Sequence, residues 1–395
     1  MRCLWVTLAD PEPRHNGQFV YSGGLIDALA AAGAEVDVLG LARDGGPSRG
    51  SRHDGRTRWW LARHRPRSQW ASLVSTLPHI ADRCHTREMA ELLNGLLAQD
   101  GWSGIVFDGL SVGWAAAPVI AALGRRRPRP RLIYVSHNHE ESLRTQIARH
   151  HPRSLRRCVM QLEALKTARL ERALVDRVDV VTAITPEDAE LYRARRPDKC
   201  VEVLTPGYQG RQVVGRRITA DLPRRAVIVG SFDWIAKRMN LEEFVGAADP
   251  LFAAAGAELC VVGSGEPAFL DRLRKSVSAT RFTGTVASVT PHLDAARIAI
   301  VPERSGGGFK LKVLDYVFNR MPILALDGSV AGVPLRHAES VILFPDHHAL
   351  AEGALRAMDD LPLLNRMQDR AYDDCRTQFD WMTRGRHLLS AMAPS

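Results

Sequence analysis

One stretch of the sequence decides the fold of this chain, and it reads Val301-Pro-Glu-Arg-Ser-Gly-Gly-Gly-Phe-Lys-Leu-Lys-Val-Leu-Asp-Tyr-Val-Phe-Asn-Arg-Met-Pro-Ile-Leu-Ala325. The apolar run 299–301 is typical of a buried strand, and apolar residues recur at helical spacing from Leu311 to Phe318. The three glycines between them, Gly306, Gly307 and Gly308, predict a strand-to-helix turn. A strand followed by a helix across a tight glycine turn is the unit of an α/β fold.

The same turn has the composition of a phosphate site. Glycines let a backbone approach a ligand closely, and the free amides and the dipole at the start of a helix favour an anion. Lys310 and Lys312 add two full positive charges, in a chain with 47 arginines and only six lysines. An ammonium group acts on phosphate as a point charge, whereas a guanidinium needs a planar fork geometry. A plain glycine turn with solvated lysines is the alternative.

Length and composition indicate a two-domain globular protein. The 395 residues are too many for one typical core, and 45% of them are hydrophobic. No apolar run reaches the ~20 residues that span a bilayer, and the first residues lead into a polar turn, so we expect a cytoplasmic protein. The six cysteines contain no C-x-x-C pair, which argues against a disulfide framework or a cysteine zinc site.

Positive charge is concentrated in the first half of the chain. Residues 1–220 carry 33 Lys and Arg against 23 Asp and Glu, whereas residues 221–395 are nearly balanced. The stretch Arg49–Trp70 holds seven arginines, one acid and three tryptophans, and Arg125–Arg131 forms a second cluster. Arginine beside tryptophan suits the anionic inner face of a membrane, where each cation adds ~1 kcal/mol of binding. A solvated basic face is the plain alternative, and nucleic acid is the least favoured partner.

Strand-like and helix-like segments alternate in both halves. The first half predicts a helix at Tyr21–Ala32 and strands at Leu4–Leu8, Glu35–Leu41, Gly104–Asp108 and Arg131–Ser136. The second half predicts helices at Leu241–Ala255 and Pro267–Ser276 and strands at Arg225–Gly230, Leu259–Gly263, Ile298–Val301, Ile323–Ala325 and Val341–Phe344. We expect doubly wound domains at 1–205 and 224–375, a linker at 206–223, and a final helix in 376–395 that returns to the first domain.

Five segments in order resemble the group-1, family-4 glycosyltransferases of GT-B fold, in the branch with a triple-glycine loop. They are Pro11–Gly17, Val229–Leu241, Val261–Gly265, Phe282–Val286 and Gly306–Ala325. The resemblance implies two Rossmann-like doubly wound domains facing a cleft. It also implies retaining transfer of a hexosyl unit, without metal or cofactor, from a nucleoside-diphosphate sugar of UDP or GDP type.

The resemblance also implies roles for residues on the donor side. Lys237 would act at the donor diphosphate, which would be held by Gly17, Gly306, Gly307, Gly308, Lys310 and Lys312. Asp315 occupies the place of the second family glutamate, which binds the ribose hydroxyls, and Leu314 and Val286 would lie near ribose and base. Fixed cations and amides at the departing phosphate would supply the main stabilisation.

On the other side of the reaction, His137 is the best match for the family histidine that contacts the transferred sugar. Asn16, Asn138 and Glu140 would face the acceptor. A purely structural role for these polar residues is one alternative. A metal site built on His137, His139 and Glu140 is another, although a single short cluster lacks a distant third ligand.

Three departures from the family pattern leave rival interpretations open. Gly307 replaces the first family glutamate, Asp315 shortens the second, and Ser231 stands where an arginine is common. A non-catalytic binding module at a membrane is therefore one rival. A nicotinamide dehydrogenase is a weaker one, because Gly263-Ser-Gly265 is only a loose dinucleotide pattern. For an enzyme we expect a lipid-linked or cell-surface glycan precursor as acceptor, with a soluble small molecule as the alternative.

Overall fold

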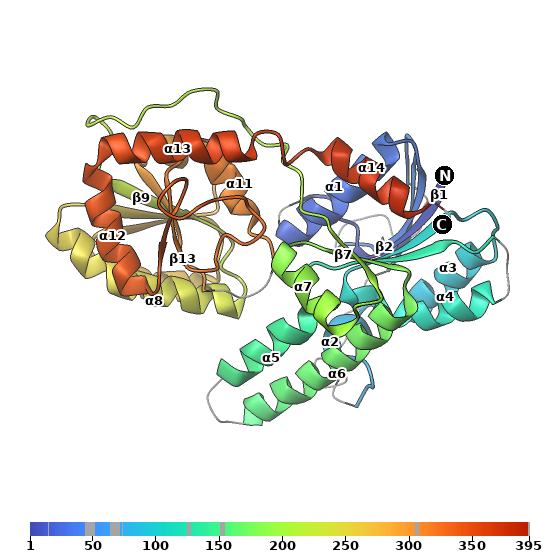
Figure 1. The fold of residues 1–395 in the computed structure, drawn as a ribbon. Helices are drawn as coiled ribbons and strands as arrows, with labels where there is room; N and C mark the ends of the chain where they lie inside the picture. The colour runs from blue at the N-terminus through green and yellow to red at the C-terminus, as the bar shows by residue number, and fades with distance from the viewer. Residues whose placement is uncertain are drawn as a thin grey trace. The chain divides into compact units, whose positions relative to one another are not determined.

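The computed structural model describes residues 1–14, 16–43, 52–63, 72, 74–124, 128–150, 155–304 and 308–393. The chain forms two compact units, shown as a ribbon in Figure 1. The first is built mainly from Met1–Gly207 and Asp380–Ser395, and the second from Tyr208–Gly306 and Lys310–Phe379. Each unit has its own sheet and its own hydrophobic core.

The sheet of the first unit is parallel apart from one edge strand. Its order is β3 (Arg52–Asp54), β4 (Thr57–Ala62), β2 (Glu35–Leu41), β1 (Arg2–Ala9), β5 (Gly104–Asp108), β6 (Arg131–Val135), β7 (Val180–Ala183) and β8 (Cys200–Val203). Only β3 runs antiparallel to its neighbour among the strands of the described residues. The helices are α1 (Gly17–Ala31), α2 (His79–Asp82), α3 (Arg87–Leu97), α4 (Ala116–Leu123), α5 (Glu140–His150), α6 (Leu155–Arg177), α7 (Pro186–Arg195) and α14 (Trp381–Ala391).

Strand β1 shows why helices cover both faces of this sheet. Its side chains alternate between two separate clusters, because successive residues of a strand point to opposite faces. Cys3 and Trp5 pack with the residues of α1 and α14, whereas Leu4 and Val6 pack with those of α3 and α4. Figure 1 shows the two pairs of helices on opposite sides of the sheet. A strand that is apolar on both faces is the mark of a doubly wound domain.

The second unit repeats the pattern with a smaller parallel sheet. Its order is β11 (Thr280–Gly284), β10 (Glu258–Val262), β9 (Arg225–Val229), β12 (Ile298–Val301), β13 (Ile323–Leu326) and β14 (Ile342–Phe344). The helices are α8 (Ile235–Ala254), α9 (Pro267–Arg274), α10 (Thr290–Asp294), α11 (Leu311–Phe318), α12 (His347–Asp359) and α13 (Leu361–Cys375). Two doubly wound α/β units in tandem confirm the predicted fold class.

The described part of the basic stretch Arg49–Trp70 corrects its interpretation as an exposed patch. Residues 57–62 form β4, which pairs in parallel with β2. The side chain of Trp59 is only 4% exposed, and the indole of Trp60 and the guanidinium of Arg58 bond Asp37 at 3.0 and 2.8 Å. In this strand Thr57, Trp59 and Leu61 are buried, whereas Arg58 and Trp60 on the other side are half-buried. Residues 44–51, 64–71 and 125–127 lie outside the described residues.

Two predicted helices begin earlier in the structure, for local reasons. The predicted helix from Tyr21 begins at Gly17, because the side chain of Asn16 caps it by accepting a bond from the amide of Phe19 at 3.0 Å. The predicted helix from Leu241 begins at Ile235. In its first turns the apolar residues Ile235 and Met239 are exposed instead of packing against the core.

The packing of α14 on α1 gives a stability prediction. A Cβ atom on Gly385 would lie 2.0 Å from the carbonyl oxygen of Ala28, so Gly385→Ala should force the two helices apart and lower the free energy of unfolding by about 1–3 kcal/mol. Urea unfolding followed by circular dichroism measures this. Gly95→Ala in α3 is the matched control, because open space surrounds that site, and it should gain about 0.5–1 kcal/mol. Equal effects of the two variants would contradict the packing argument.

Candidate active site

In each sheet the order of the strands reverses at one point, and a candidate group of side chains lies beside that point. In an open parallel sheet, ligands bind beyond the carboxyl ends of the strands, at the position where the connections diverge to opposite sides. That position lies between β1 and β5 in the first unit and between β9 and β12 in the second. Asp108 ends β5, and Glu303 follows β12 by two residues. Each unit therefore has its own candidate group of side chains at this edge of its sheet.

A group of three lysines around Glu303 forms the part on the second unit. Lys312 pairs with the carboxylate of Glu303, and Lys237 and Lys310 are electrostatic neighbours of both. Burial lowers the pKa of Lys237 and of Lys310, and the other ammonium groups lower both pKa values further. Within the described residues, neither Lys237 nor Lys310 forms an ion pair. These two cations are available to an anion.

The remaining donor-side residues vary in their access to a ligand. Gly308 is half-buried with a φ of 74°, in the left-handed region that favours glycine, and it lies two residues before the capping Lys310 of α11. Val286 is half-buried just beyond β11. The side chain of Leu314 is completely buried, so it cannot touch ribose or base in this conformation. The predicted contacts of Gly306 and Gly307 lie outside the described residues.

Asp315 carries a carboxyl group with an unusual pKa. Burial raises its pKa from 3.8 to about 6, although a hydrogen bond from the Tyr208 hydroxyl acts in the opposite direction. The ring of Tyr208 is stacked on Phe318 at 4.4 Å between centroids. A stacked aromatic ring beside a half-buried carboxylate can hold a hydroxyl-bearing ligand such as a ribose, because the carboxylate accepts hydrogen bonds from the hydroxyls.

The pKa of Asp315 predicts how stability depends on pH. The folded protein binds more protons than the unfolded chain between about pH 4 and 6, so its stability falls as pH rises through that window and stays lowered above it. Asp315→Asn should remove this penalty and gain about 1–2 kcal/mol at pH 8, with little gain near pH 4. Thermal or urea unfolding at both pH values measures this. An equal gain at pH 4 and pH 8 would show that ionisation of Asp315 is not the cause.

On the first unit, His137 is held by a buried carboxylate. Its Nε2 lies 2.6 Å from Oδ1 of Asp108, and the Oδ2 atom accepts bonds from Trp5 Nε1 at 3.0 Å and Thr7 Oγ1 at 2.8 Å. Burial raises the pKa of Asp108, but His137 and the other donors outweigh burial and hold it below its ordinary value. The carboxylate stays ionised, so the Nε2 of His137 carries a proton. The ring of Tyr21 meets the imidazole edge-on, at 5.4 Å between centroids.

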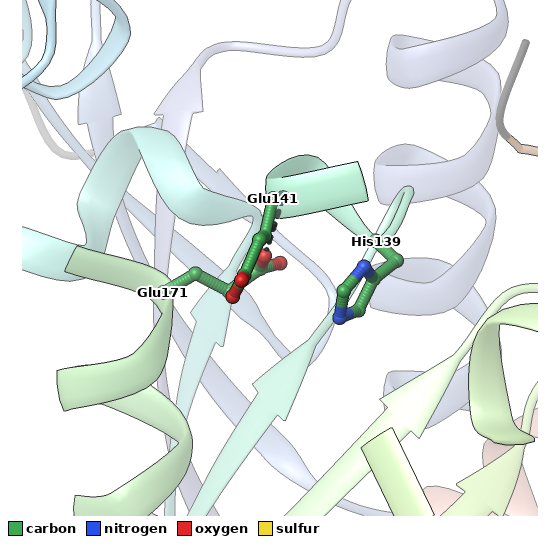
Figure 2. A group of neighbouring side chains, drawn as sticks. All are labelled: His139, Glu141 and Glu171. Atoms are coloured by element: carbon green, nitrogen blue, oxygen red, sulfur yellow. Dashed lines mark hydrogen bonds between the residues drawn. The ribbon is translucent and has the colours of Figure 1, made fainter. Parts of the chain in front are cut away.

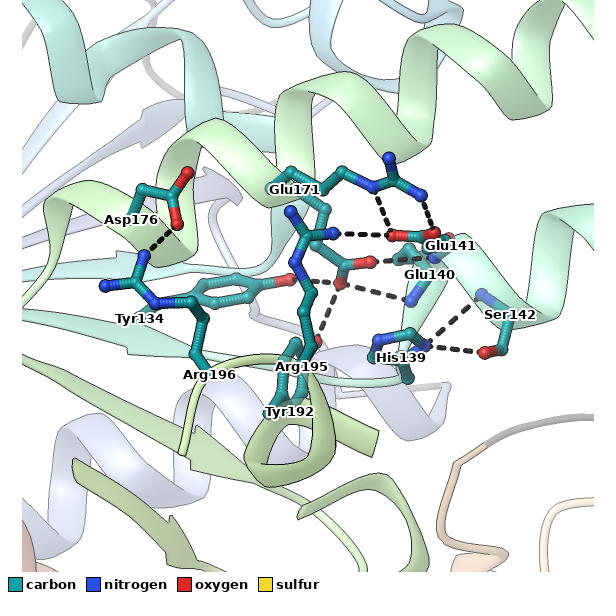
Figure 3. A network of polar contacts seen from close by, with 11 residues as sticks. Tyr134, His139, Glu140, Glu141, Ser142, Glu171, Asp176, Tyr192, Arg195 and Arg196 are labelled. Atoms are coloured by element: carbon teal, nitrogen blue, oxygen red, sulfur yellow. Dashed lines mark hydrogen bonds and ion pairs between the residues drawn. The ribbon is translucent and has the colours of Figure 1, made fainter. Parts of the chain in front are cut away.

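The start of α5, which follows the loop with His137, is held by Glu171, and Figure 3 shows the contacts of Glu171. The carboxylate of Glu171, on α6, accepts the backbone N–H groups of Glu140 and Glu141 at 3.1 and 2.7 Å. It also accepts the hydroxyls of Tyr192 at 2.7 Å and Tyr134 at 3.2 Å. A carboxylate at the first turn of α5 is favoured by the free amides there. Burial nevertheless raises the pKa of Glu171 to about 7.

The side chains of His139, Glu141 and Glu171 lie close enough to hold a metal ion (Figure 2). Their donor atoms are already engaged. Glu141 pairs with Arg172 and Arg195, the four bonds described above occupy Glu171, and Nδ1 of His139 bonds Ser142. A metal would have to displace two guanidinium groups and several hydrogen bonds, so these residues fit a structural network better than a metal site.

The acceptor-side residues gather around the starts of α1 and α5. Gly17 is exposed as the first residue of α1, directly after its cap Asn16. The side-chain amide of Asn138 bonds Glu140 at 3.2 Å, and Glu140 also pairs with Arg144 one turn later. His137, the third residue of the metal interpretation, is bound to Asp108 instead. The structure does not assemble His137, His139 and Glu140 into one ligand set.

Comparisons with known proteins agree with this geometry. Residues 16–207 match the family described as "Glycosyl transferase 4-like domain", and residues 223–360 match "Glycosyl transferases group 1". No curated protein matches the chain. Among the solved structures that do match, the sucrose-phosphate synthase of Thermosynechococcus elongatus is 20% identical, with a TM-score of 0.74 over 99% of this chain and 98% of that one.

Two further structures share the fold. WaaG, a glycosyltransferase involved in lipopolysaccharide biosynthesis, is 16% identical with a TM-score of 0.65 over the full length of both chains. HepE of Anabaena, solved in complex with UDP and glucose, is 11% identical with a TM-score of 0.65 over 99% of each chain. At these identities the likeness shows the fold alone, and this fold is the GT-B architecture. The chain belongs to the group-1 glycosyltransferases. It is a retaining hexosyltransferase that uses a nucleotide sugar.

Three residues of the site were not predicted from the sequence. Asp108 and Glu303 both follow apolar strands closely, and that position is a usable signal because the carboxyl ends of parallel strands form the binding edge. Glu171 gave no such signal. It lies within the 23-residue helix α6, among other charged residues, and only the folded chain brings it under the start of α5.

Proposed function

We propose that this enzyme uses a UDP- or GDP-sugar and transfers the sugar to a lipid-linked or cell-surface glycan precursor at the inner face of a membrane, without a metal ion. The lysine group beyond β12 supports the donor part of the proposal. Lys237 and Lys310, which form no ion pair within the described residues, are two cations near the point of the second sheet where nucleotides are expected to bind. Their charge matches that of a diphosphate ester.

The proposed chemistry needs no protein nucleophile. The bond between the sugar C1 and the diphosphate oxygen breaks, and the acceptor oxygen forms a new bond to C1 on the same face. The acceptor proton passes to the departing phosphate. Lys237 and Lys310 would stabilise the negative charge on that phosphate, and His137, oriented by Asp108, would contact the sugar as positive charge develops on it. Positioning of the substrates and exclusion of water would supply the rest of the rate acceleration.

A ligand panel tests the donor part. Unfolding temperature should rise with either UDP or GDP and remain unchanged with NAD, because a ligand that binds only the folded state stabilises it by mass action. Transfer of labelled sugar from the corresponding nucleotide sugar then establishes catalysis. Stabilisation by NAD alone would favour a dehydrogenase. Donor binding without transfer or hydrolysis would favour the non-catalytic alternative that Gly307 and Ser231 suggest.

A cavity in the first unit supports an acceptor with both apolar and charged parts. Its volume is about 420 Å³, and its lining combines Ile80, Val159 and Met160 with Arg83, Arg144, Glu163, His79 and Thr167. Apolar walls with a few charged groups are typical of sites for amphiphilic ligands. The excess of positive charge in residues 1–220 also favours an anionic acceptor or surface. None of the helices in the described residues is long and apolar enough to cross a bilayer, so any membrane contact would be peripheral.

The acceptor proposal has its own test. Transfer to a sugar linked to a prenyl diphosphate should exceed transfer to the same free sugar, and Met160→Asp should reduce the first reaction far more than the second. Binding to vesicles that contain anionic lipid should weaken as salt rises. Equal use of both acceptors, with no vesicle binding, would favour a soluble small-molecule acceptor.

A further inference from the structure

Glu303 is a buried acid in the middle of a cationic site, and none of the roles given above explains it. Its side chain is 11% exposed. One carboxylate oxygen pairs with Lys312, and the other, Oε2, is buried without a hydrogen-bond partner among the described residues. A buried carboxylate is costly unless charges of opposite sign surround it. The three lysines are those charges, so Glu303 and the lysines stabilise one another.

The backbone on both sides of Glu303 is held in place. Nε2 of His347, at the start of α12, lies 2.8 Å from the carbonyl oxygen of Pro302. The amide of Arg304 donates to the side-chain oxygen of Asn240, on α8, at 3.2 Å. Two helices thus hold the residues that flank Glu303. Because its backbone is held, the Glu303 carboxylate stays in one place, and its charge attracts the Lys312 ammonium group to that place.

The charges within the lysine group indicate what effect a fixed Glu303 carboxylate has on the lysines. Burial lowers the pKa of Lys237 and Lys310, and neighbouring ammonium groups, Lys312 above all, add to this effect. Glu303 acts in the opposite direction on both lysines. The other charged neighbour of Lys237 is Asp233, which is exposed and bonds Ser231 at 2.5 Å. Beyond these, the charges beside Pro302 and Arg304 are His347 and Glu243.

We propose that Glu303 is the internal counter-ion of the lysine group. It holds Lys312 in place, keeps Lys237 and Lys310 protonated, and thereby sets how far into the alkaline range the site binds a diphosphate. This inference rests on the proposed donor site. It makes Glu303 a positioning residue that acts through the lysines rather than by touching the substrate. It also divides the lysines into one that is committed to Glu303 and two that face the ligand.

Calorimetric titration with UDP or GDP from pH 7.5 to 10.5 tests this role. The affinity for the nucleotide should decrease at high pH, because a lysine then loses its proton. In Glu303→Gln this decrease should begin about one pH unit lower or more, because the negative charge beside the lysines has been removed. Glu303→Asp should restore most of the wild-type profile. Each variant is compared with the wild type at the same pH, so titration of the ligand itself cancels.

If Glu303→Gln fails to fold, Lys312→Met provides an independent test of the same proposal. Without the Lys312 ammonium group, Lys237 and Lys310 lose a repelling positive charge but keep the attraction of Glu303. The decrease in nucleotide affinity at alkaline pH should therefore begin at a higher pH than in the wild type. Opposite shifts in the two variants support the counter-ion role. Uniformly weaker binding with an unchanged profile would mean that Glu303 is only structural. If neither nucleotide binds the wild type, the proposed donor site itself is wrong.

Discussion

Replacing Lys310 with alanine should reduce the affinity for UDP or GDP by about 10- to 100-fold, because each hydrogen bond to a charged group contributes about 1.5–3 kcal/mol. Lys237→Ala should do the same. Both ammonium groups are largely withdrawn from water and lack an ion pair within the described residues, so a bound diphosphate would gain their full attraction. Calorimetric titration at pH 7.5 measures the loss, and the double variant should show no binding.

Two further variants test whether the lost affinity comes from a defined site. Lys275→Ala removes a lysine of the same unit that caps the end of α9, away from the lysine group, and should leave affinity unchanged. Lys310→Arg keeps the charge but changes its geometry, so it should recover only part of the binding. If Lys275→Ala weakened binding as much as Lys310→Ala, the attraction would come from the overall charge of the unit and not from a defined site.

The second large effect is expected at His137. His137→Ala should lower kcat by about 10²- to 10³-fold, the usual loss when a group that stabilises developing charge is removed. The KM for the donor should change far less, because most of the proposed diphosphate contacts come from residues of the second unit. Steady-state kinetics with both substrates varied separates the two constants. Asp108→Asn should lose part of the same rate, since an amide cannot fix the imidazole as a carboxylate does.

His139→Ala is the matched control for this experiment. His139 lies two residues further along the same loop, but its ring bonds Ser142 and meets Tyr192 edge-on, outside the contact with Asp108. The variant should keep kcat within a few-fold of the wild type. Similar losses in the two histidine variants would indicate that the loop as a whole had moved, and a normal kcat in His137→Ala would remove this residue from the mechanism.

Much of the architecture could be predicted from the sequence because strands buried on both faces are continuous apolar runs. The strands Glu35–Leu41, Gly104–Asp108 and Ile298–Val301 were predicted with the bounds that the structure shows. Strand β4 was not predicted, because it lies in a stretch of many arginines and its own Arg58 interrupts the apolar pattern. Neutralisation by Asp37 occurs only in the folded chain.

The candidate site was predictable only in part. A glycine turn with two lysines is a local pattern, so the sequence can predict such a turn, although Gly306 and Gly307 lie outside the described residues. The partners of those lysines are not local. Glu303 is nine residues before Lys312, and Lys237 lies on another helix. Asp108 and His137 are 29 residues apart and meet because β5 and β6 are neighbours in the sheet. Such pairings depend on strand order, which a single sequence does not display.

The position of α14 has a consequence for how the protein is made. The first unit contains the beginning of the chain and also residues 380–395, and Trp381, Leu388 and Met392 fill the same core cluster as Tyr21 and Leu25. During synthesis, the ribosome translates the entire second unit before this helix emerges. The first unit therefore keeps an uncovered apolar face until the second unit has been translated. Fragments or chimeras that stop at residue 207 would keep that face exposed, so exchange of domains between enzymes of this kind should carry the last helix along with the first unit.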